Sequence, residues 1–304
     1  MIARSLLTGE VIASYGRQYK VRTNQRDFLC FTRGKRTDIA CGDHVQIRIQ
    51  SEDQAVIETC LKRHNLIYRS DQFREKLIAA NVNQIIVVIA AEPSFSPDLV
   101  SRALVAAEAA DVPVLIILNK SELASFKTAR ERAEIYSRLG YRIIDCSLKT
   151  ERQQALDRLL PYLADKTNVI LGQSGMGKST LVNLLSPDAQ VQTREISEKL
   201  DSGKHTTTSA QLYHGSWKNQ AFRVIDSPGF QEFGLAHLSV RELENAFVEF
   251  RPHLGGCRFY NCQHLNEPGC AVIKAVEHGD IASARMNLYR QLHSELKIHH
   301  QDYE

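Results

Sequence analysis

The chain has 304 residues, of which 43% are hydrophobic and 24% charged, a composition typical of a globular protein with two or three domains. No apolar run approaches the roughly 20 residues of a membrane-spanning helix, and the N-terminus has no long apolar segment, so we expect a cytoplasmic protein without membrane contact. The net charge of +3 is too small to indicate a nucleic-acid partner. Residues 1–65 carry eleven Lys and Arg against seven Asp and Glu, which suits either a phosphate-backbone partner or an ordinary solvated surface.

The first 64 residues read as short strands separated by turns. Four stretches mix β-branched and aromatic residues with polar ones, and glycines punctuate them; these stretches are residues 9–16, 17–23, 27–33 and 43–49. They show no helical periodicity. The pattern predicts a small β-barrel, with the OB-fold as the natural candidate.

From about residue 80 the pattern changes to that of an α/β sheet. The expected buried strands are residues 84–91, 112–118, 142–146, 167–171 and 222–225. The expected helices between them are residues 97–110, a charged stretch ending near Gly140, and residues 151–164. Continuous apolar runs alternating with helices are typical of parallel strands covered on both faces.

Local signals mark some boundaries of these elements. Ser96 before Pro97 predicts a capped helix start, and Thr150 with Gln153 predicts a capping box. The polar residues 190–208 lack periodicity and predict a mobile loop, whereas the chain after residue 240 is expected to be helical.

The strongest functional signal is the sequence GQSGMGKS at residues 172–179, which matches G-x-x-x-x-G-K-S. It lies between an apolar strand and an apolar helix, as this motif requires. Its glycines permit a tight turn whose backbone N–H groups surround phosphate oxygens. Lys178 is expected to reach the β- and γ-phosphates, and the Ser179 hydroxyl to hold Mg²⁺. The expected phosphate contacts are Gly172, Gln173, Ser174, Gly175, Met176, Gly177, Lys178, Ser179 and Thr180.

A second signal, D-S-P-G at residues 226–229, ends the apolar strand before it. Alone the pattern is also a common turn. Following a P-loop, it indicates that Asp226 holds the Mg²⁺ shell and that the Gly229 N–H senses the γ-phosphate.

A third signal, N-K-S-E at residues 119–122, follows a buried strand and matches the N-K-x-D element by which GTPases read guanine. Asn119 would reach the purine edge, Lys120 would pack over the base, and Glu122 stands where the acid accepts from the base. Glu122 keeps the charge but adds one methylene, and an unpaired base donor would cost about 1–3 kcal/mol. Ser147, after the strand at 142–146, would belong to the loop that supports the guanine carbonyl.

The order of these motifs is unusual. The base-reading elements precede the P-loop, and the Mg²⁺ and γ-phosphate elements follow it, whereas the usual GTPase order places the base-reading elements last. A circular permutation keeps the same spatial site while moving the chain ends.

On these motifs the chain resembles the RsgA family of circularly permuted bacterial GTPases, and the resemblance covers the whole chain. Residues 203–208, G-K-H-T-T-T, are similar to the family's switch segment G-R-H-T-T-T, with Lys204 in place of Arg. The resemblance implies that a switch threonine, for which we choose Thr207, completes the Mg²⁺ shell. The alternative is a polar loop with incidental threonines. The resemblance also implies the small ribosomal subunit and its rRNA as partners that accelerate hydrolysis.

A metal site is predicted in the C-terminal part. Cys257, Cys262, His264 and Cys270 form a C-x₄-C-x-H-x₅-C pattern, and three thiolates with one imidazole are a closed tetrahedral set for structural Zn²⁺. Free buried cysteines are the alternative. The other cysteines, at positions 30, 41, 60 and 146, are expected to be small buried hydrophobic residues.

The position after the D-x-x-G glycine is Phe230, which cannot orient a water molecule, so intrinsic hydrolysis is expected to be slow. By resemblance, His237 takes the place of a histidine to which the family's catalysis is attributed. The catalytic residues we expect are therefore Lys178, Asp226 and His237. A structural role for a lone histidine on a helix is the alternative.

The resulting hypothesis is a monomeric α/β protein with three parts. These are an OB-like RNA-binding barrel at residues 1–66, a permuted Ras-like GTPase core at 67–238 and a helical zinc-binding domain at 239–304. It would hydrolyse GTP with Mg²⁺ to give GDP and assist late maturation of the small ribosomal subunit. Two rivals remain: an ATP-using P-loop enzyme, suggested by Glu122, and a nucleotide-gated RNA-binding protein with vestigial hydrolysis, suggested by Phe230.

Overall fold

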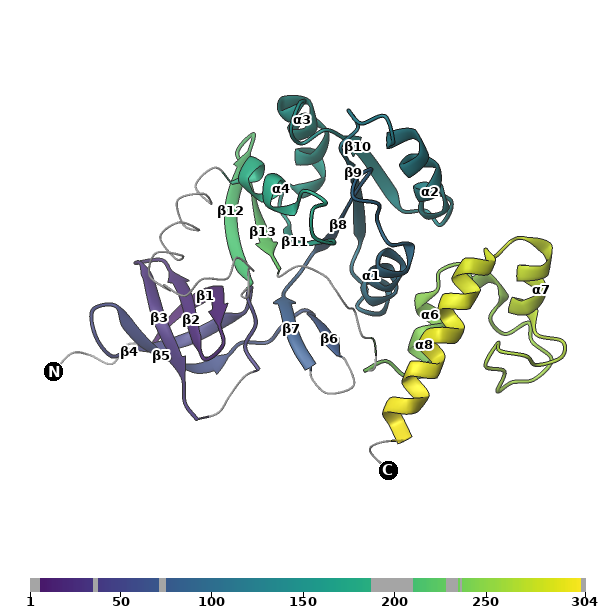
Figure 1. Cartoon of the computed structure of the whole chain (residues 1–304). Helices are drawn as coiled ribbons and strands as arrows, with labels where there is room; N and C mark the ends of the chain where they lie inside the picture. The colour runs from purple at the N-terminus through teal and green to yellow at the C-terminus, as the bar shows by residue number, and fades with distance from the viewer. Residues whose placement is uncertain are drawn as a thin grey trace.

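The computed structural model describes residues 6–34, 38–70, 75–186, 210–227, 235 and 237–301. A central sheet with helices on both faces separates a small barrel on one side from a group of helices on the other (Figure 1). The α/β fold class with a barrel at one end and helices at the other is therefore confirmed. The loop expected at residues 190–208 lies outside the described residues.

The N-terminal barrel has five strands: β1 (Leu6–Tyr15), β2 (Gln18–Thr23), β3 (Asp27–Thr32), β4 (His44–Ile49) and β5 (Gln54–Cys60). Pairing runs β1-β2-β3-β5-β4 and closes because β1 also pairs with β4. Apolar side chains such as Val21, Phe28 and Ile47 alternate with polar ones and fill the interior. This arrangement confirms the expected OB-like barrel, although the sequence analysis missed β5.

Five parallel strands form the core of the central sheet, in the order β10 (Arg142–Cys146), β9 (Val114–Asn119), β8 (Gln84–Ala90), β11 (Thr167–Leu171) and β13 (Gln220–Asp226). The sixth strand, and the last before the barrel, is β12 (Gln211–Trp217), which pairs antiparallel with β13 and also contacts β1 at Ala13. The barrel and the central sheet therefore form one continuous sheet of 11 strands.

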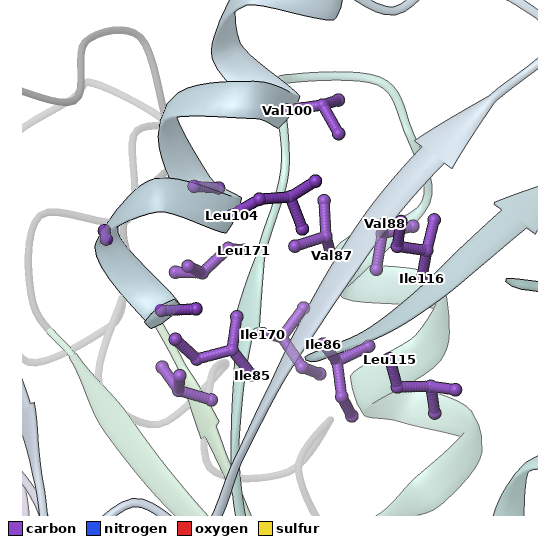
Figure 2. Packing of buried hydrophobic residues seen from close by; sticks show 14 of the residues in the cluster. Ile85, Ile86, Val87, Val88, Val100, Leu104, Leu115, Ile116, Ile170 and Leu171 are labelled. Carbon is purple, nitrogen blue, oxygen red and sulfur yellow. The ribbon is translucent and has the colours of Figure 1, made fainter. Parts of the chain in front are cut away.

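The helices α1 (Pro97–Ala109) and α2 (Phe126–Arg138) lie on one face of the central sheet, and α3 (Arg152–Leu163) and α4 (Lys178–Leu185) on the other (Figure 1). Figure 2 shows Val100 and Leu104 of α1 facing Val87 of β8 and Leu171 of β11. Every residue of β8 is buried, which explains its continuous apolar sequence. This packed core fixes the positions of the strand ends, and the loops predicted to bind nucleotide follow those strand ends.

A two-stranded hairpin, β6 (Leu66–Ser70) with β7 (Glu75–Ala80), joins the barrel to β8. The C-terminal part contains α6 (Val240–Ala246), the 3₁₀ turn η1 (Arg251–His253), α7 (Ala271–His278) and α8 (Ser283–Gln301). It docks on α1, where Arg102 donates two hydrogen bonds of 2.7 and 2.8 Å to Glu295 of α8. No helix in the described ranges is both long and apolar enough to cross a membrane.

One predicted helix cap is confirmed and one is wrong. Ser96 caps α1, and its Oγ accepts from the Leu99 N–H with Pro97 at the first turn. The capping box of Thr150 and Gln153 does not form, because α3 begins after Glu151 without a side-chain cap. The Thr150 N–H instead donates to Ser147 Oγ, one turn earlier.

Three of the four scattered cysteines are fully buried, as expected, and Cys60 is partly buried. Burial raises the pKa of the Cys30 and Cys146 thiols to about 12. Such thiols stay protonated at neutral pH, so they act as packing residues rather than nucleophiles.

Candidate nucleotide-binding site and metal centre

The functional loops predicted from sequence meet at one edge of the central sheet. The strands β9, β10, β11 and β13 run parallel, so their carboxyl ends lie together at this edge. Asn119, Cys146, Leu171 and Asp226 end these four strands. Open α/β sheets bind their ligands at the carboxyl ends of the strands, at the point where the strand order reverses, which here is next to β8.

The loop after β11 requires two of its glycines. Gly172 has φ +151° and Gly177 has φ +109°, a region that residues with a side chain rarely adopt. A Cβ on Gly172 would lie 2.4 Å from the Val88 carbonyl oxygen, and one on Gly177 would lie 2.3 Å from Asn119 Nδ2. The chain then enters α4 at Lys178, whose Nζ donates to the Gln173 carbonyl at 2.8 Å. The loop is compact, the Lys178 ammonium group is hydrogen-bonded across it, and the N-terminus of α4 follows it directly. This arrangement suits phosphate.

Asn119 joins three loops at this edge. Its Nδ2 donates to the Met176 carbonyl in the P-loop at 2.9 Å, and its Oδ1 accepts from the Leu148 N–H at 3.0 Å. The side chain is only 4% exposed, so both bonds are shielded from water. The residue predicted to read the purine edge therefore also holds the P-loop against the loop after β10.

The other predicted base contacts surround this asparagine. Lys120 has φ +67°, and its Nζ donates to the Glu92 carbonyl. Ser147 is buried and its Oγ is bonded to Thr150 Oγ1 at 2.6 Å, so it supports the loop rather than facing solvent. Glu122 is exposed at the rim.

The charges of Asp226 and Lys178 each shift the pKa of the other group. Burial raises the pKa of the Asp226 carboxyl to about 6, although the Lys178 charge acts to lower it. Burial also lowers the pKa of Lys178, and Asp226 opposes that shift. The neighbouring Ser179 and Thr180 side chains are exposed at the start of α4. A partly buried carboxylate, a lysine and an exposed hydroxyl group are the groups that a magnesium-bound polyphosphate needs.

The raised pKa of Asp226 predicts a pH-dependent stability. A carboxyl whose pKa is higher in the folded than in the unfolded chain binds its proton more tightly when folded, so it lowers the free energy of unfolding as pH rises from about 4 to about 6. We expect Asp226→Asn to raise the Tm of the nucleotide-free protein at pH 8 by on the order of 2–5 °C. The difference should grow between these two pH values and level off above them, in thermal unfolding scans from pH 4 to pH 8.

The matched control for this measurement is Asp157→Asn, because Asp157 is an exposed carboxylate on α3. It should leave the Tm nearly unchanged at every pH. A stabilisation by Asp226→Asn that shrinks as pH rises would contradict the assignment of a raised pKa.

One part of the site was missed by the sequence analysis. The segment between β8 and α1, residues 92–96, contacts the P-loop and the loop after β9. The Ser96 N–H donates to Gln173 Oε1 at 2.7 Å, and oxygens of Glu92 accept hydrogen bonds from Lys120 Nζ and Ser125 Oγ. Ser96 before Pro97 was recognised only as a helix cap. Nothing in that dipeptide shows a contact with a residue 77 positions later.

His237 lies away from the P-loop in this structure. Its ring packs against that of Tyr68 with centroids 4.1 Å apart and planes tilted by 44°, and the two residues line a small cavity with Ala106 and Ala110 at the end of α1. The opposite end of α1, at Ser96, is the one that touches the P-loop. Its 13 residues span about 20 Å. The catalytic role of His237 stays a prediction, as do the roles of Thr207 and Gly229, which lie outside the described residues together with Phe230.

The four predicted metal ligands come together. One ligand atom each from Cys257, Cys262, His264 and Cys270 lies within 4.8 Å of the others. Cys257 Sγ lies 3.8 Å from Cys270 Sγ and 3.5 Å from His264 Nδ1. Tetrahedral Zn²⁺ with bonds of about 2.0–2.3 Å separates its ligand atoms by similar distances.

The surroundings of the cluster also fit a metal. The Ala271 N–H points at Cys257 Sγ at 3.4 Å, and the Ile273 N–H at Cys270 Sγ at 3.5 Å. His264 turns its other nitrogen, Nε2, toward Glu244 at 3.9 Å. Such partners fix the orientation of ligands and stabilise thiolates.

The architecture is also found in solved proteins. It matches the crystal structure of YloQ, described as a circularly permuted GTPase, with 28% identity, a TM-score of 0.67 and 96% of each chain covered. YjeQ from Thermotoga maritima matches with 31% identity and a TM-score of 0.71, over 96% of this chain and 99% of that one. The fold and the order of its motifs thus define a circularly permuted GTPase.

A family model described as RsgA GTPase matches residues 60–236, more than half of the chain. The chain belongs to the RsgA GTPase family. A "Small ribosomal subunit biogenesis GTPase RsgA" of Ralstonia pickettii (strain 12J) is 52% identical over 288 residues, which cover 93% of this chain and 91% of that protein. The protein with the same description in Paraburkholderia phytofirmans is 52% identical over 289 residues, covering 93% and 92%.

Proposed function

We propose that the edge of the central sheet binds GTP and Mg²⁺ and that Lys178 and Asp226 support hydrolysis to GDP. The observation that carries this proposal is the pair of hydrogen bonds that link Asn119 to the Met176 carbonyl and the Leu148 N–H, which we call the Asn119 clamp. The clamp joins the P-loop to the two loops predicted to read guanine. Gly172 to Thr180 surround the phosphates, with Lys178 on the β- and γ-phosphates. Ser179, Thr207 and Asp226 hold the Mg²⁺ shell, in which the ion neutralises charge on the phosphate oxygens when it is bound.

Guanine recognition is assigned to Asn119, Lys120, Glu122 and Ser147. Lys120 is already positioned by its bond to the Glu92 carbonyl, which leaves its aliphatic stem to cover the base. Glu122 at the exposed rim accepts from the base in place of the usual aspartate. Gly229 is assigned to the γ-phosphate.

The proposed client is the small ribosomal subunit, through its rRNA. The support is the description of the relatives, each named a small ribosomal subunit biogenesis GTPase at 52% identity. The basic excess in residues 1–65 gives the barrel of domain 1–66 a surface for rRNA phosphates. In this proposal a cytoplasmic monomer hydrolyses GTP slowly alone and faster on the subunit. The core spans 67–238, and the domain at 239–304 is held by one structural Zn²⁺ on Cys257, Cys262, His264 and Cys270.

We propose that His237 orients the attacking water, which requires that it leave its ring contact with Tyr68. His237→Ala should then lower hydrolysis stimulated by small subunits by about 100-fold or more, because general base groups contribute this much. The measurement is single-turnover hydrolysis of GTP with and without subunits, together with the affinity for GDP.

His278→Ala, an exposed histidine at the end of α7, serves as the control and should hydrolyse GTP at the wild-type rate. An equal rate for His237→Ala and wild type would remove His237 from the mechanism. If subunits failed to accelerate even the wild type, the rival of a nucleotide-gated RNA-binding protein with vestigial hydrolysis would be favoured.

Binding of fluorescent GDP, in competition with GTP, GDP and ATP, tests the nucleotide assignment. Displacement by GTP and GDP but not by ATP is expected. Equal displacement by ATP would show that Glu122 does not read guanine and would favour the ATP-using rival.

A further inference from the structure

The loop between Cys257 and Cys262 places two adjacent aromatic rings in solvent. Tyr260 is 103% exposed and Phe259 is 42% exposed. Within the described ranges, only Leu6 and Ile298 are other large hydrophobic residues exposed to a similar degree. A ring in full contact with water contributes no buried area to the fold, so folding does not explain an aromatic residue at position 260. We call Phe259 and Tyr260 the aromatic platform.

The backbone beneath the aromatic platform is held in place. The Arg258 N–H donates to the Gly269 carbonyl at 3.1 Å, and the Cys262 N–H donates to the Phe259 carbonyl at 3.3 Å. Gly269 has φ +77°, and a Cβ there would lie 3.0 Å from Arg258 Cβ, so the two segments approach closely. Metal ligands precede and follow the loop. It can therefore present its rings without a large loss of conformational entropy on binding.

Two arginines lie next to the aromatic platform, Arg258 on the Phe259 ring and Arg241 in the hollow that Tyr260 also lines, and a third, Arg290, binds the turn that follows. The Arg258 guanidinium lies 5.5 Å from the centre of the Phe259 ring, and Arg290 donates to the Leu265 carbonyl. Arg241 stands exposed on α6. In the part of the chain that the structure describes, none of these three guanidinium groups forms an ion pair.

Two carboxylates lie nearby, Glu267 in the loop and Glu244 on α6, whose charge interacts with that of Arg241. Glu267 accepts hydrogen bonds from the N–H groups of Gln263, Leu265 and Asn266 at 2.8–3.0 Å. Glu244 faces His264. Arg258, which has no ion pair among the described residues, and Arg241, whose charge Glu244 balances only in part, leave this surface attractive to phosphate.

A hollow of about 610 Å³ lies beside the aromatic platform. Its lining includes Arg241, Phe259, Tyr260, Asn261 and Gln263, the acidic residue Glu244 and three of the four metal ligands. Volumes of about 300–1,000 Å³ accommodate small ligands. Amide side chains next to an aromatic ring are suited to the polar edge of a stacked base.

We propose that the aromatic platform binds an unpaired base of single-stranded RNA, which stacks on Tyr260 while Arg241 and Arg258 contact the flanking phosphates. Aromatic and guanidinium planes are the groups on which proteins stack unpaired RNA bases. A protein partner would be expected to meet a broader apolar surface than two rings surrounded by arginines and amides. The inference rests on the proposed function, in which the client contains rRNA, and assigns it a contact site in the C-terminal domain.

The test compares the full chain with Tyr260→Ala, Tyr260→Trp and Ile298→Ala. Ile298 is half exposed on α8 of the same part of the chain and serves as the matched control. Fluorescence anisotropy measures binding to a labelled single-stranded RNA of about ten nucleotides, to a duplex of the same sequence and to purified small ribosomal subunits. Zinc content and the Tm of each variant verify that the domain is intact.

Loss of one stacked base should weaken single-strand binding by Tyr260→Ala about 5- to 100-fold, leave duplex binding within two-fold and be restored by Tyr260→Trp. Ile298→Ala should bind like the wild type. Equal weakening by Ile298→Ala, or unchanged single-strand binding by Tyr260→Ala, would overturn the stacking site. Wild-type protein that binds the single strand but not the subunit would instead contradict the proposed client.

Discussion

Gly177→Ala is expected to weaken GDP binding by at least about 100-fold. A residue with a side chain at φ +109° costs roughly 1–2 kcal/mol in the left-handed region, and its Cβ would lie 2.3 Å from Asn119 Nδ2. Asn119 cannot move aside freely, because it is buried and bonded to both Met176 and Leu148. Displacing it leaves two buried backbone groups unpaired, at about 1–3 kcal/mol each, and 1.4 kcal/mol corresponds to a factor of ten in affinity.

Gly140→Ala provides a matched control for this prediction. Gly140 has φ +90°, close to that of Gly177, but a Cβ there would meet nothing within 4 Å. It carries the same kind of backbone strain without a clash at the nucleotide edge. Calorimetric titration with GDP should therefore show near-normal affinity for Gly140→Ala. Equal losses in the two variants would mean that backbone strain alone, and not the Asn119 clamp, determines the affinity.

Cys270→Ser is expected to release the metal and to unfold the C-terminal part locally. Cys270 is buried at the start of α7, where its Sγ lies 3.3 Å from His264 Nδ1 and 3.8 Å from Cys257 Sγ. Binding of structural Zn²⁺ contributes directly to the free energy of folding, and serine is a poor replacement for a thiolate. Elemental analysis should find about one Zn²⁺ per wild-type chain and a several-fold lower content in the variant. Hydrogen exchange should accelerate by at least about ten-fold in residues 251–278.

Cys60→Ser, which changes a thiol outside the cluster, should keep the full zinc content. A wild-type protein purified without chelators that holds no zinc, or a Cys270→Ser variant that keeps one equivalent, would contradict the metal assignment. Addition of a chelator to the wild type should reproduce the exchange pattern of Cys270→Ser, which separates loss of metal from a local effect of the substitution.

Contiguous motifs made most of the nucleotide edge predictable from sequence. The P-loop is a run of eight residues between a strand and a helix, and its glycines are required by local φ values and close approaches. Asn119 and Asp226 could be placed because each ends an apolar strand, and parallel strands bring their carboxyl ends together. The metal cluster was predictable for the same reason, since its ligands lie within 14 residues.

Contacts between distant segments were not predictable in this way. Three contacts each depend on how packed elements meet: the ring contact of His237 with Tyr68, the hydrogen bond from Ser96 to Gln173 and the ion pair of Arg102 with Glu295. The strands β5 and β12 were missed because charged residues or glycine interrupt their apolar alternation. The capping box at Thr150 failed because Ser147, which no propensity rule connects to α3, takes the N–H of Thr150.

The sheet that joins barrel and core has a consequence for the order in which the protein is assembled during synthesis. Strands β1 to β5 close on one another within residues 6–60, so the barrel has all its partners early. The barrel pairs with the core where Ala13 meets Gln211, and this pairing must wait until 151 further residues after Cys60 have been made. Pairings so distant in sequence form slowly. The nascent barrel is therefore folded but not yet paired with the core while this part of the chain is made, and its final orientation is set only when β12 arrives.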